Sequence, residues 1–271
     1  MLSHKKIAVI GAGNMGRALI GGMLNAKLTS PKNITASRRN EEAVKELRKR
    51  WGIHAVTDNK KAAAGADIVI LAVKPQLAQA VLGEIAPVIQ KNQIIVSIMA
   101  GLTTAAIVKK LKKPCPVVRA MPNTPCLVDA GATAIAAGTH AGEKDLALAE
   151  SIFKSVGKVV TLPESALDAV TGLSGSGPAY IFLVAEALIA AGVEAGLDPE
   201  VSRTLTLETI AGAGRLLVET GEEPETLRAQ VTSPGGTTEA GLAALETSGL
   251  RKAFEVAVAA ATARSRIMSL S

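Results

Sequence analysis

The apolar run Ile7-Ala8-Val9-Ile10 continues without a break into Gly11-Ala12-Gly13-Asn14-Met15-Gly16. A short strand-like run followed by G-x-G-x-x-G and the start of a helix is the context in which this motif indicates dinucleotide binding. The first glycine permits a tight turn, the second lets the backbone approach a pyrophosphate, and the third allows the helix to pack closely on the strand. An ordinary glycine-rich turn is the alternative. We expect residues 11–16 to hold a diphosphate at a helix N-terminus.

The rest of the first half alternates β-branched runs with amphipathic stretches, which is typical of βαβ units around a parallel sheet. Strands are expected at residues 7–10, 34–36, 68–73, 94–98 and 117–120, and two more, at 132–136 and 158–161, would extend the far edge of the sheet. Helices are expected at 15–24, 41–51, 78–89 and 143–156, the third broken or redirected at Pro87. Strand-like runs stop at about Pro163. We expect an α/β Rossmann-type domain over residues 1–162 and an all-α domain over residues 163–271.

The composition argues against several partners. The formal charge of +6 favours anions, but aromatic residues make up only 2% of the chain, so bases would have almost nothing to stack on and we expect no nucleic-acid partner. Cys115 and Cys126 do not have metal-ligand spacing, which predicts inert thiols and no metal site. The first residues contain no signal-peptide core, which favours a cytoplasmic, reduced protein.

One segment of the C-terminal half, residues 179–193, is apolar almost all round and is interrupted by Glu186. This pattern predicts a helix that is buried on every side. The run is shorter than the roughly 20 residues of a membrane span and lacks flanking lysines or arginines, so we expect no membrane contact. A second subunit is the expected cover, which makes the C-terminal region a dimerisation domain.

The end of the second expected strand indicates which dinucleotide binds. It reads Ala36-Ser37-Arg38-Arg39, where an NAD-specific site would place Asp or Glu. A carboxylate would repel a 2′-phosphate, whereas a serine hydroxyl and guanidinium groups match its oxygens. We therefore expect NADPH, with NADH as a weaker cofactor. The alternative is that both arginines merely lead into a solvated helix.

Residues that follow the next strands are candidates for the ribose and nicotinamide, because strand ends of an open parallel sheet face the ligand. These are Lys74-Pro75 and Met99-Ala100. The structural alternative places Pro75 at the first position of a helix and Lys74 in solvent.

The C-terminal half contains few of the usual proton carriers. The last histidine is His140, no lysine lies between Lys158 and Lys252, and Tyr180 is the only tyrosine. Reduction of a neutral ketone needs a positioned proton donor, whereas an iminium is already protonated when it accepts a hydride. A carbon–nitrogen double bond is therefore the leading electrophile.

The hydroxyl-rich loop Thr232-Ser233-Pro234-Gly235-Gly236-Thr237-Thr238 precedes a helical pattern over residues 239–245. Free backbone amides at a helix start, with hydroxyls beside them, suit a carboxylate. The alternative is a simple turn followed by a threonine N-cap.

Several segments together resemble the pyrroline-5-carboxylate reductase family, whose members make proline by reducing a cyclic imine with NADPH or NADH. The segments are the glycine motif at 11–16, Ala72-Val73-Lys74-Pro75, Met121-Pro122-Asn123-Thr124-Pro125, residues 168–180 (DAVTGLSGSGPAY) and the loop 232–238. They extend over nearly the whole chain, and the last two are more specific than any dinucleotide motif.

The resemblance implies an interlocked homodimer, often assembled into rings up to a homodecamer, with each active site between the cofactor domain and helices of both subunits. It implies that Thr238 is catalytic and meets the ring nitrogen, and that the substrate, a small imino acid, is bound by Ser233, Gly235, Gly236 and Thr237 with Glu164 close by. Motif and resemblance together give the expected cofactor residues Gly11, Ala12, Gly13, Asn14, Met15, Gly16, Ser37, Arg38, Arg39, Asn59, Ala72, Val73, Lys74, Pro75, Met99, Ala100 and Asn123. Gln230 departs from the asparagine found there in some relatives, which leaves its contact open.

Two other functions fit parts of the sequence. A β-hydroxyacid dehydrogenase also combines a Rossmann domain with helices, but it needs a lysine on the helix after its glycine motif, and residues 172–199 contain none. A non-catalytic NADPH-binding protein, in which the loop at Ser233 is only a turn, would bind the cofactor without turning over an imine.

Overall fold

The computed structural model describes residues 2–270 and divides the chain into two compact units. The sheet unit comprises Met1–Ser176 and Ala259–Ser271, and the helical unit comprises Gly177–Val258.

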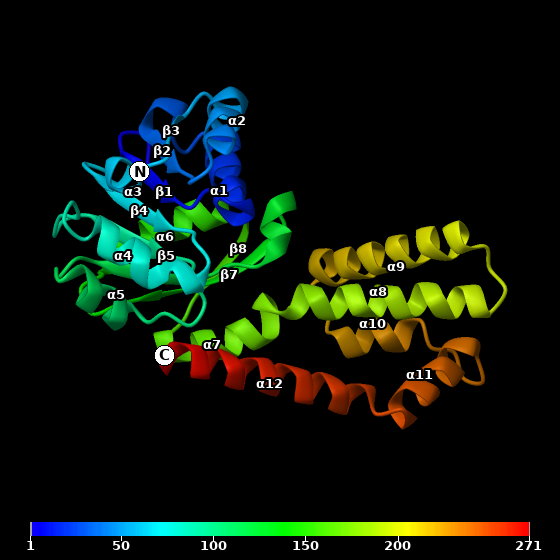
Figure 1. Ribbon diagram of the computed structural model, residues 1–271. Coiled ribbons are helices and arrows are strands. Elements are labelled where there is room, and N and C mark those ends of the chain that lie inside the picture. Colours follow the sequence, from blue (N-terminus) through cyan, green and yellow to red (C-terminus); the bar gives the residue numbers. More distant parts are fainter. Residues whose placement is uncertain (1, 271) are drawn as a thin grey trace. The chain divides into compact units, whose positions relative to one another are not determined.

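The sheet unit is built on an eight-stranded sheet with the strand order β3-β2-β1-β4-β5-β6-β7-β8 (Figure 1). The strands are β1 (Ile7–Ile10), β2 (Ile34–Ser37), β3 (His54–Val56), β4 (Ile68–Leu71), β5 (Ile94–Ser97), β6 (Val117–Met121), β7 (Gly131–Ala137) and β8 (Gly157–Thr161). Neighbours pair in parallel except β6 and β7, which are antiparallel. The segment 122–130 between those two is too short for the crossover that a parallel pair requires. The seven strands expected from the sequence, and the extension of the far edge, are thus confirmed.

Helices cover both faces of this sheet because alternate strand residues point to opposite sides. Ile7 and Val9 of β1 belong to the core cluster that contains Leu19 and Phe153, whereas Ala8 and Ile10 belong to the cluster on the other face. The helices of the sheet unit are α1 (Asn14–Asn25), α2 (Glu41–Trp51), α3 (Asn59–Ala63), α4 (Ala78–Ile85), α5 (Thr104–Leu111), α6 (Glu143–Lys154), α7 (Leu167–Val170) and the end of α12 (Leu250–Leu270). Short 3₁₀ or π turns lie at η1 (Pro31–Asn33), η2 (Pro75–Leu77), η3 (Thr124–Val128), η4 (Glu164–Ala166) and η5 (Thr171–Gly175).

The chain leaves β1 in one direction to form β2 and β3, and then returns to the other side of β1 to form β4 and β5. This reversal is the topological switch point at which doubly wound sheets bind ligands, beyond the carboxyl ends of the strands.

The helical unit contains α8 (Gly177–Glu194), α9 (Pro199–Thr220), α10 (Pro224–Gln230), α11 (Thr237–Thr247) and the start of α12. Figure 1 shows α8 and α9 side by side, and Ser202 Oγ of α9 donates a hydrogen bond to the Ile189 carbonyl of α8 at 2.8 Å. Gly192 allows the two helices to pack this closely, because a Cβ at this position would lie 2.2 Å from Ser202 Oγ.

The single chain does not bury the apolar helix, so its expected burial depends on a second subunit and stays a prediction. No residue of α8 is buried within the described chain, and Phe182 and Leu183 are 61% and 65% exposed. By length and composition alone, the helical stretch Glu164–Glu194 would suffice to cross a membrane. Contiguous exposed apolar surface of this kind is characteristic of an interaction site.

A pair of neighbouring glycines in α1 tests how tightly the helices pack on the sheet. A Cβ on Gly22 would lie 2.3 Å from Val156 Cγ1 and 2.9 Å from the Ser155 carbonyl, whereas a Cβ on Gly21 would find its nearest neighbour, Trp51 Cζ2, at 3.9 Å. We expect Gly22→Ala to lower the free energy of unfolding by about 1–3 kcal/mol through overpacking. Gly21→Ala should raise it by up to about 1 kcal/mol through helix propensity. Urea denaturation measures both, and equal effects would contradict the packing.

Candidate active site

The glycine motif forms the turn between β1 and α1. Gly11 has φ +84°, and a Cβ there would lie 2.4 Å from Val73 Cγ1, so only glycine fits. The Gly11 and Ala12 amides donate to the Ser37 carbonyl at 3.2 and 3.0 Å, which ties the turn to the end of β2. A Cβ on Gly16 would lie 3.2 Å from Val9 Cγ1, which accounts for the third glycine. The N-cap of α1 is Gly13, which has no side chain, so no side-chain cap shields the first amides of the helix.

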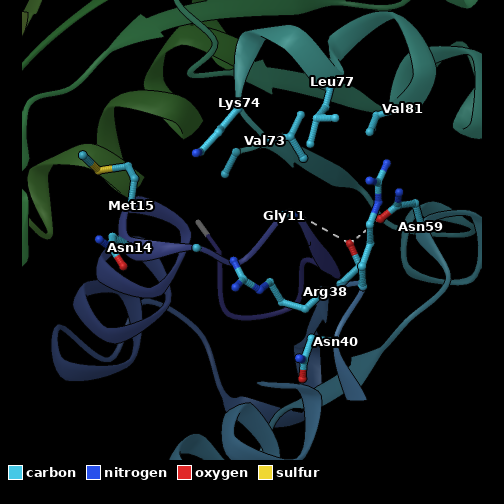
Figure 2. Close-up of a pocket in the computed structure, with 14 residues that line it drawn as sticks. Gly11, Asn14, Met15, Arg38, Asn40, Asn59, Val73, Lys74, Leu77 and Val81 are labelled. Carbon is cyan, nitrogen blue, oxygen red and sulfur yellow. Dashed lines mark hydrogen bonds between the residues drawn. The ribbon is translucent and has the colours of Figure 1, made fainter. Parts of the chain in front are cut away.

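A cavity of about 510 Å³ opens beside this turn, at the carboxyl ends of β1, β2 and β4 (Figure 2). Its lining includes most of the expected cofactor residues. The lining residues are Gly11, Gly13, Asn14, Met15, Ser37, Arg38, Arg39, Asn40, Asn59, Ala72, Val73, Lys74, Leu77 and Val81. The glycine turn and the arginine pair, which are far apart in the sequence, thus contribute to one site.

Other expected cofactor residues do not line this cavity. Ala12 and Gly16 are buried behind the turn, Met99 is 2% exposed, and Ala100 follows β5. Pro75 occupies the first position of η2, as its structural alternative predicted. Asn123 precedes η3, where its Oδ1 accepts from the Ala132 amide at 2.9 Å.

The sequence reading missed three lining residues. Asn40 Oδ1 accepts from the Ala43 amide as the N-cap of α2, so its local role is structural. Leu77 and Val81 lie four residues apart on η2 and α4, and they give the cavity an apolar wall. Their helical spacing was visible in the sequence, but its position at the ligand edge of the sheet was not.

The cavity lining is cationic. It contains Arg38, Arg39 and Lys74 and no Asp or Glu. Figure 2 shows the Arg38 and Lys74 side chains extending toward the same space from the ends of β2 and β4. A carboxylate at the end of β2, the mark of an NAD-specific site, is absent from this lining. The site is suited to a dinucleotide that carries an additional phosphate.

A second polar cluster of the sheet unit surrounds Arg119, which lies on β6 and is 3% exposed. Its guanidinium lies 3.6 Å from Glu164 Oε1 and 3.6 Å from Asp168 Oδ1. Glu164 also accepts hydrogen bonds from the Thr104 amide and hydroxyl, both at 2.7 Å, and Asp168 accepts one from Ser265 Oγ at 2.7 Å. The expected substrate residue Glu164 is thus bound to the start of α5. An arginine inside a buried strand was the sequence signal for such a cluster, because buried charges are paired.

The hydroxyl-rich loop lies in the helical unit, where it connects α10 to α11. Gly235 has φ +70°, and the Gly236 amide donates to the Ser233 carbonyl at 3.0 Å, which closes a turn. The N-cap of α11 is Gly236, so the threonine N-cap of the structural alternative is not formed. Ser233, Gly235, Thr237 and Thr238 are exposed, and Gly236 is half-buried.

Two further expectations concern thiols and metals. Cys115 and Cys126 are both buried, and desolvation raises the pKa of each thiol, which keeps both protonated at neutral pH. Within residues 2–270, no group of three or more His, Cys, Asp or Glu side chains is arranged to hold a metal ion.

The chain is similar to known proteins over nearly its whole length. A family model described as pyrroline-5-carboxylate reductase dimerisation matches residues 164–268, and one described as NADP oxidoreductase, coenzyme F420-dependent, matches residues 6–101. The chain is 42% identical to pyrroline-5-carboxylate reductase 1 of Bacillus spizizenii over 99% of this chain and 91% of that protein.

Two solved structures are also similar. A pyrroline-5-carboxylate reductase from Coxiella burnetii matches with a TM-score of 0.91 and 39% identity over 98% of both chains. A pyrroline carboxylate reductase from Plasmodium falciparum, solved with NADP bound, matches with a TM-score of 0.87 and 32% identity over 98% of this chain and 99% of that chain.

The switch-point cavity, its cationic lining and these matches define a Rossmann-type oxidoreductase that uses NADP. The similarity spans the sheet unit, the helical unit and the loop 232–238 alike. Within that class, the chain belongs to the pyrroline-5-carboxylate reductase family.

The Arg119 cluster predicts a large effect from a single substitution. Arg119→Met leaves two largely buried carboxylates without their cation, so we expect the free energy of unfolding to fall by about 3 kcal/mol. The matched control is Arg17→Met, which breaks an exposed ion pair with Glu46 at 2.6 Å. Hydrogen bonds from Arg17 lower the pKa of the Glu46 carboxyl, so the two side chains do interact in the folded protein. Urea denaturation should show a clearly smaller loss for the control. Similar losses for both variants would show that burial of the Arg119 cluster is unimportant.

Proposed function

We propose that the chain reduces 1-pyrroline-5-carboxylate to L-proline, the last step of proline biosynthesis, with a hydride from NADPH. The observation that carries the proposal is the cationic cavity at the switch point, in a chain similar to reductases of this imine over 99% of its length. NADPH supplies the hydride. The chain's own residues bind and orient the cofactor and the substrate, and they exclude water from the site.

The proposed cofactor contacts follow from the cavity. The amides at the start of α1 and the turn 11–16 hold the diphosphate. Arg38 and Arg39 bind the 2′-phosphate through charge-assisted hydrogen bonds, and Leu77 and Val81 pack on the adenine. The remaining proposed cofactor residues are Asn59, Ala72, Val73, Lys74, Pro75, Met99, Ala100 and Asn123, with NADH as a weaker substitute.

The proposed substrate site uses the loop 232–238. Ser233, Gly235, Gly236 and Thr237 bind the carboxylate through hydroxyls and the amides at the start of α11. The substrate enters as the iminium, so Thr238 needs only to orient the ring nitrogen and relay its proton. Glu164 is also proposed as a substrate residue, since a carboxylate keeps acceptor capacity beyond the two bonds it receives from Thr104.

The family match makes the protein a homo-oligomer with a dimerisation region. We propose that a second copy of the chain covers the exposed apolar side chains of α8, and that residues 163–271 act as the substrate-binding and dimerisation domain beside an NADP-binding domain over residues 1–162. We further propose that dimers assemble into rings, up to a homodecamer, in the cytoplasm.

The proposed reaction is tested by mixing the purified protein with NADPH and 1-pyrroline-5-carboxylate and following the nicotinamide absorbance. We expect turnover by the wild type and at least a roughly tenfold loss for Thr238→Ala, because the ring nitrogen loses its orienting hydroxyl. The matched control is Thr247→Ala at the other end of α11, which should retain wild-type turnover. A wild type that leaves the imine unreduced contradicts the function, and wild-type kinetics in Thr238→Ala remove that residue from the mechanism.

Cofactor preference is tested at the arginine pair. For the double variant Arg38→Ala/Arg39→Ala we expect kcat/KM with NADPH to fall about tenfold or more, because each charge-assisted bond contributes about 1.5–3 kcal/mol. The value with NADH should change little. Arg50→Ala is the control, because the Arg50 guanidinium lies over the Trp51 ring at 4.8 Å and outside the cavity lining. Equal losses with both cofactors would mean that the arginines do not read the 2′-phosphate.

A further inference from the structure

Behind the cavity lining, four residues form one continuous chain of hydrogen bonds. The Gly11 amide donates to Ser37 Oγ at 3.4 Å, and Ser37 Oγ donates to Asn59 Oδ1 at 2.7 Å. Asn59 Nδ2 in turn donates to Glu84 Oε2 at 2.9 Å. The first three residues line the cavity (Figure 2), whereas Glu84 lies on α4 outside the lining.

The carboxylate end of this chain fixes the direction of its hydrogen bonds. A backbone amide only donates and an ionised carboxylate only accepts, whereas a hydroxyl and a side-chain amide do both. Because Glu84 accepts, the NH₂ group of Asn59 must face it, which turns the Asn59 oxygen toward Ser37. With the Asn59 amide reversed, two acceptor oxygens would face each other across the 2.9 Å contact. The Gly11 donor at the opposite end is compatible with this direction, because the Ser37 oxygen can accept from Gly11 while its proton is donated to Asn59.

This direction determines what the cavity offers to a ligand. The single hydroxyl proton of Ser37 is donated to Asn59, so Ser37 does not have it available for a phosphate oxygen. Asn59 has a second N–H, because Glu84 accepts only one of the two. Donors for the 2′-phosphate are therefore the Arg38 and Arg39 guanidiniums and the Asn59 amide, while the Ser37 hydroxyl holds the glycine turn.

We propose that Glu84 is a positioning residue for the cofactor: it orients the Asn59 amide so that the cavity presents an N–H donor to the NADPH phosphate. The proposal rests on the proposed use of NADPH. Simple electrostatics predicts that removing the carboxylate strengthens NADPH binding, because a carboxylate near an anion site repels the anion. The positioning role predicts the opposite, namely weaker NADPH binding.

The test compares Glu84→Gln with Glu84→Met. The glutamine loses the charge but keeps an acceptor oxygen, whereas the methionine has similar length and no comparable acceptor. Measured by NADPH fluorescence without the imine, the dissociation constant should stay within about twofold of wild type for Glu84→Gln and rise about three- to tenfold for Glu84→Met. In turnover assays KM for NADPH should follow the dissociation constant, and kcat should not change.

Three controls separate this role from a structural one. Glu150→Met removes a carboxylate of α6 that pairs with Lys154 at 2.7 Å, and it should leave NADPH affinity unchanged. Adding Asn59→Ala to Glu84→Met should cost less affinity than the two single effects combined, because both act through one amide. Thermal melting of each variant identifies loss of fold.

Tighter binding of NADPH by both Glu84 variants would overturn the proposal in favour of charge repulsion. Wild-type affinity in Glu84→Met would overturn it as well. If the wild type binds NADPH but does not reduce the imine, the proposed reaction fails, and the binding measurements still decide the role of Glu84.

Discussion

The backbone conformation at Gly11 is the constraint on which the cofactor site depends. Its positive φ turns the chain from β1 into α1 at a point where a Cβ would collide with Val73. The same turn donates two amides to the carbonyl of Ser37, at the end of β2, and the Ile10 carbonyl before it accepts from the Ala72 amide after β4. Three strand ends are thereby held around one turn. The side chains that follow these strand ends, such as Arg38 and Lys74, reach the same cavity because the turn holds the strand ends together.

Charge is distributed so that the cavity stays cationic. Arg38, Arg39 and Lys74 belong to the lining. The carboxylate of Glu84, which accepts a hydrogen bond from the lining residue Asn59, does not. At β6 the arrangement is reversed, because the buried Arg119 faces two carboxylates and the start of α5 supplies further donors. A guanidinium with two carboxylates leaves one excess negative charge, which favours a cationic ligand nearby.

Local patterns in the sequence predicted most of the sheet unit. The runs at β1, β4 and β5 are apolar and β-branched, and the glycine motif follows β1 directly, so sequence and structure agree there. β3 was missed because His54–Val56 is three residues long and has no alternation that distinguishes it from a loop. The partners of Arg119 lie 45 residues or more away along the chain, and no local pattern connects residues at that distance. For α8, hydrophobicity predicted a helix that needs a cover, which the single chain does not provide, and a sequence does not reveal which chain would.

The helical unit contains an internal example of the binding that the reaction needs. Glu239 Oε2 accepts a hydrogen bond from the Gly235 amide at 2.7 Å, so this amide already binds a carboxylate oxygen at the start of α11. The glycine N-cap places no side chain over the neighbouring amides, and Gly235, which has a positive φ, precedes this N-cap, so its amide takes no part in the hydrogen bonds of the helix. In the proposed substrate site, the substrate carboxylate would take the place of Glu239, whose side chain is exposed. In the proposed mechanism the iminium carries its own positive charge, so a loop of amides and hydroxyls would be sufficient for the substrate. The scarcity of lysine, histidine and tyrosine in this unit agrees with that chemistry.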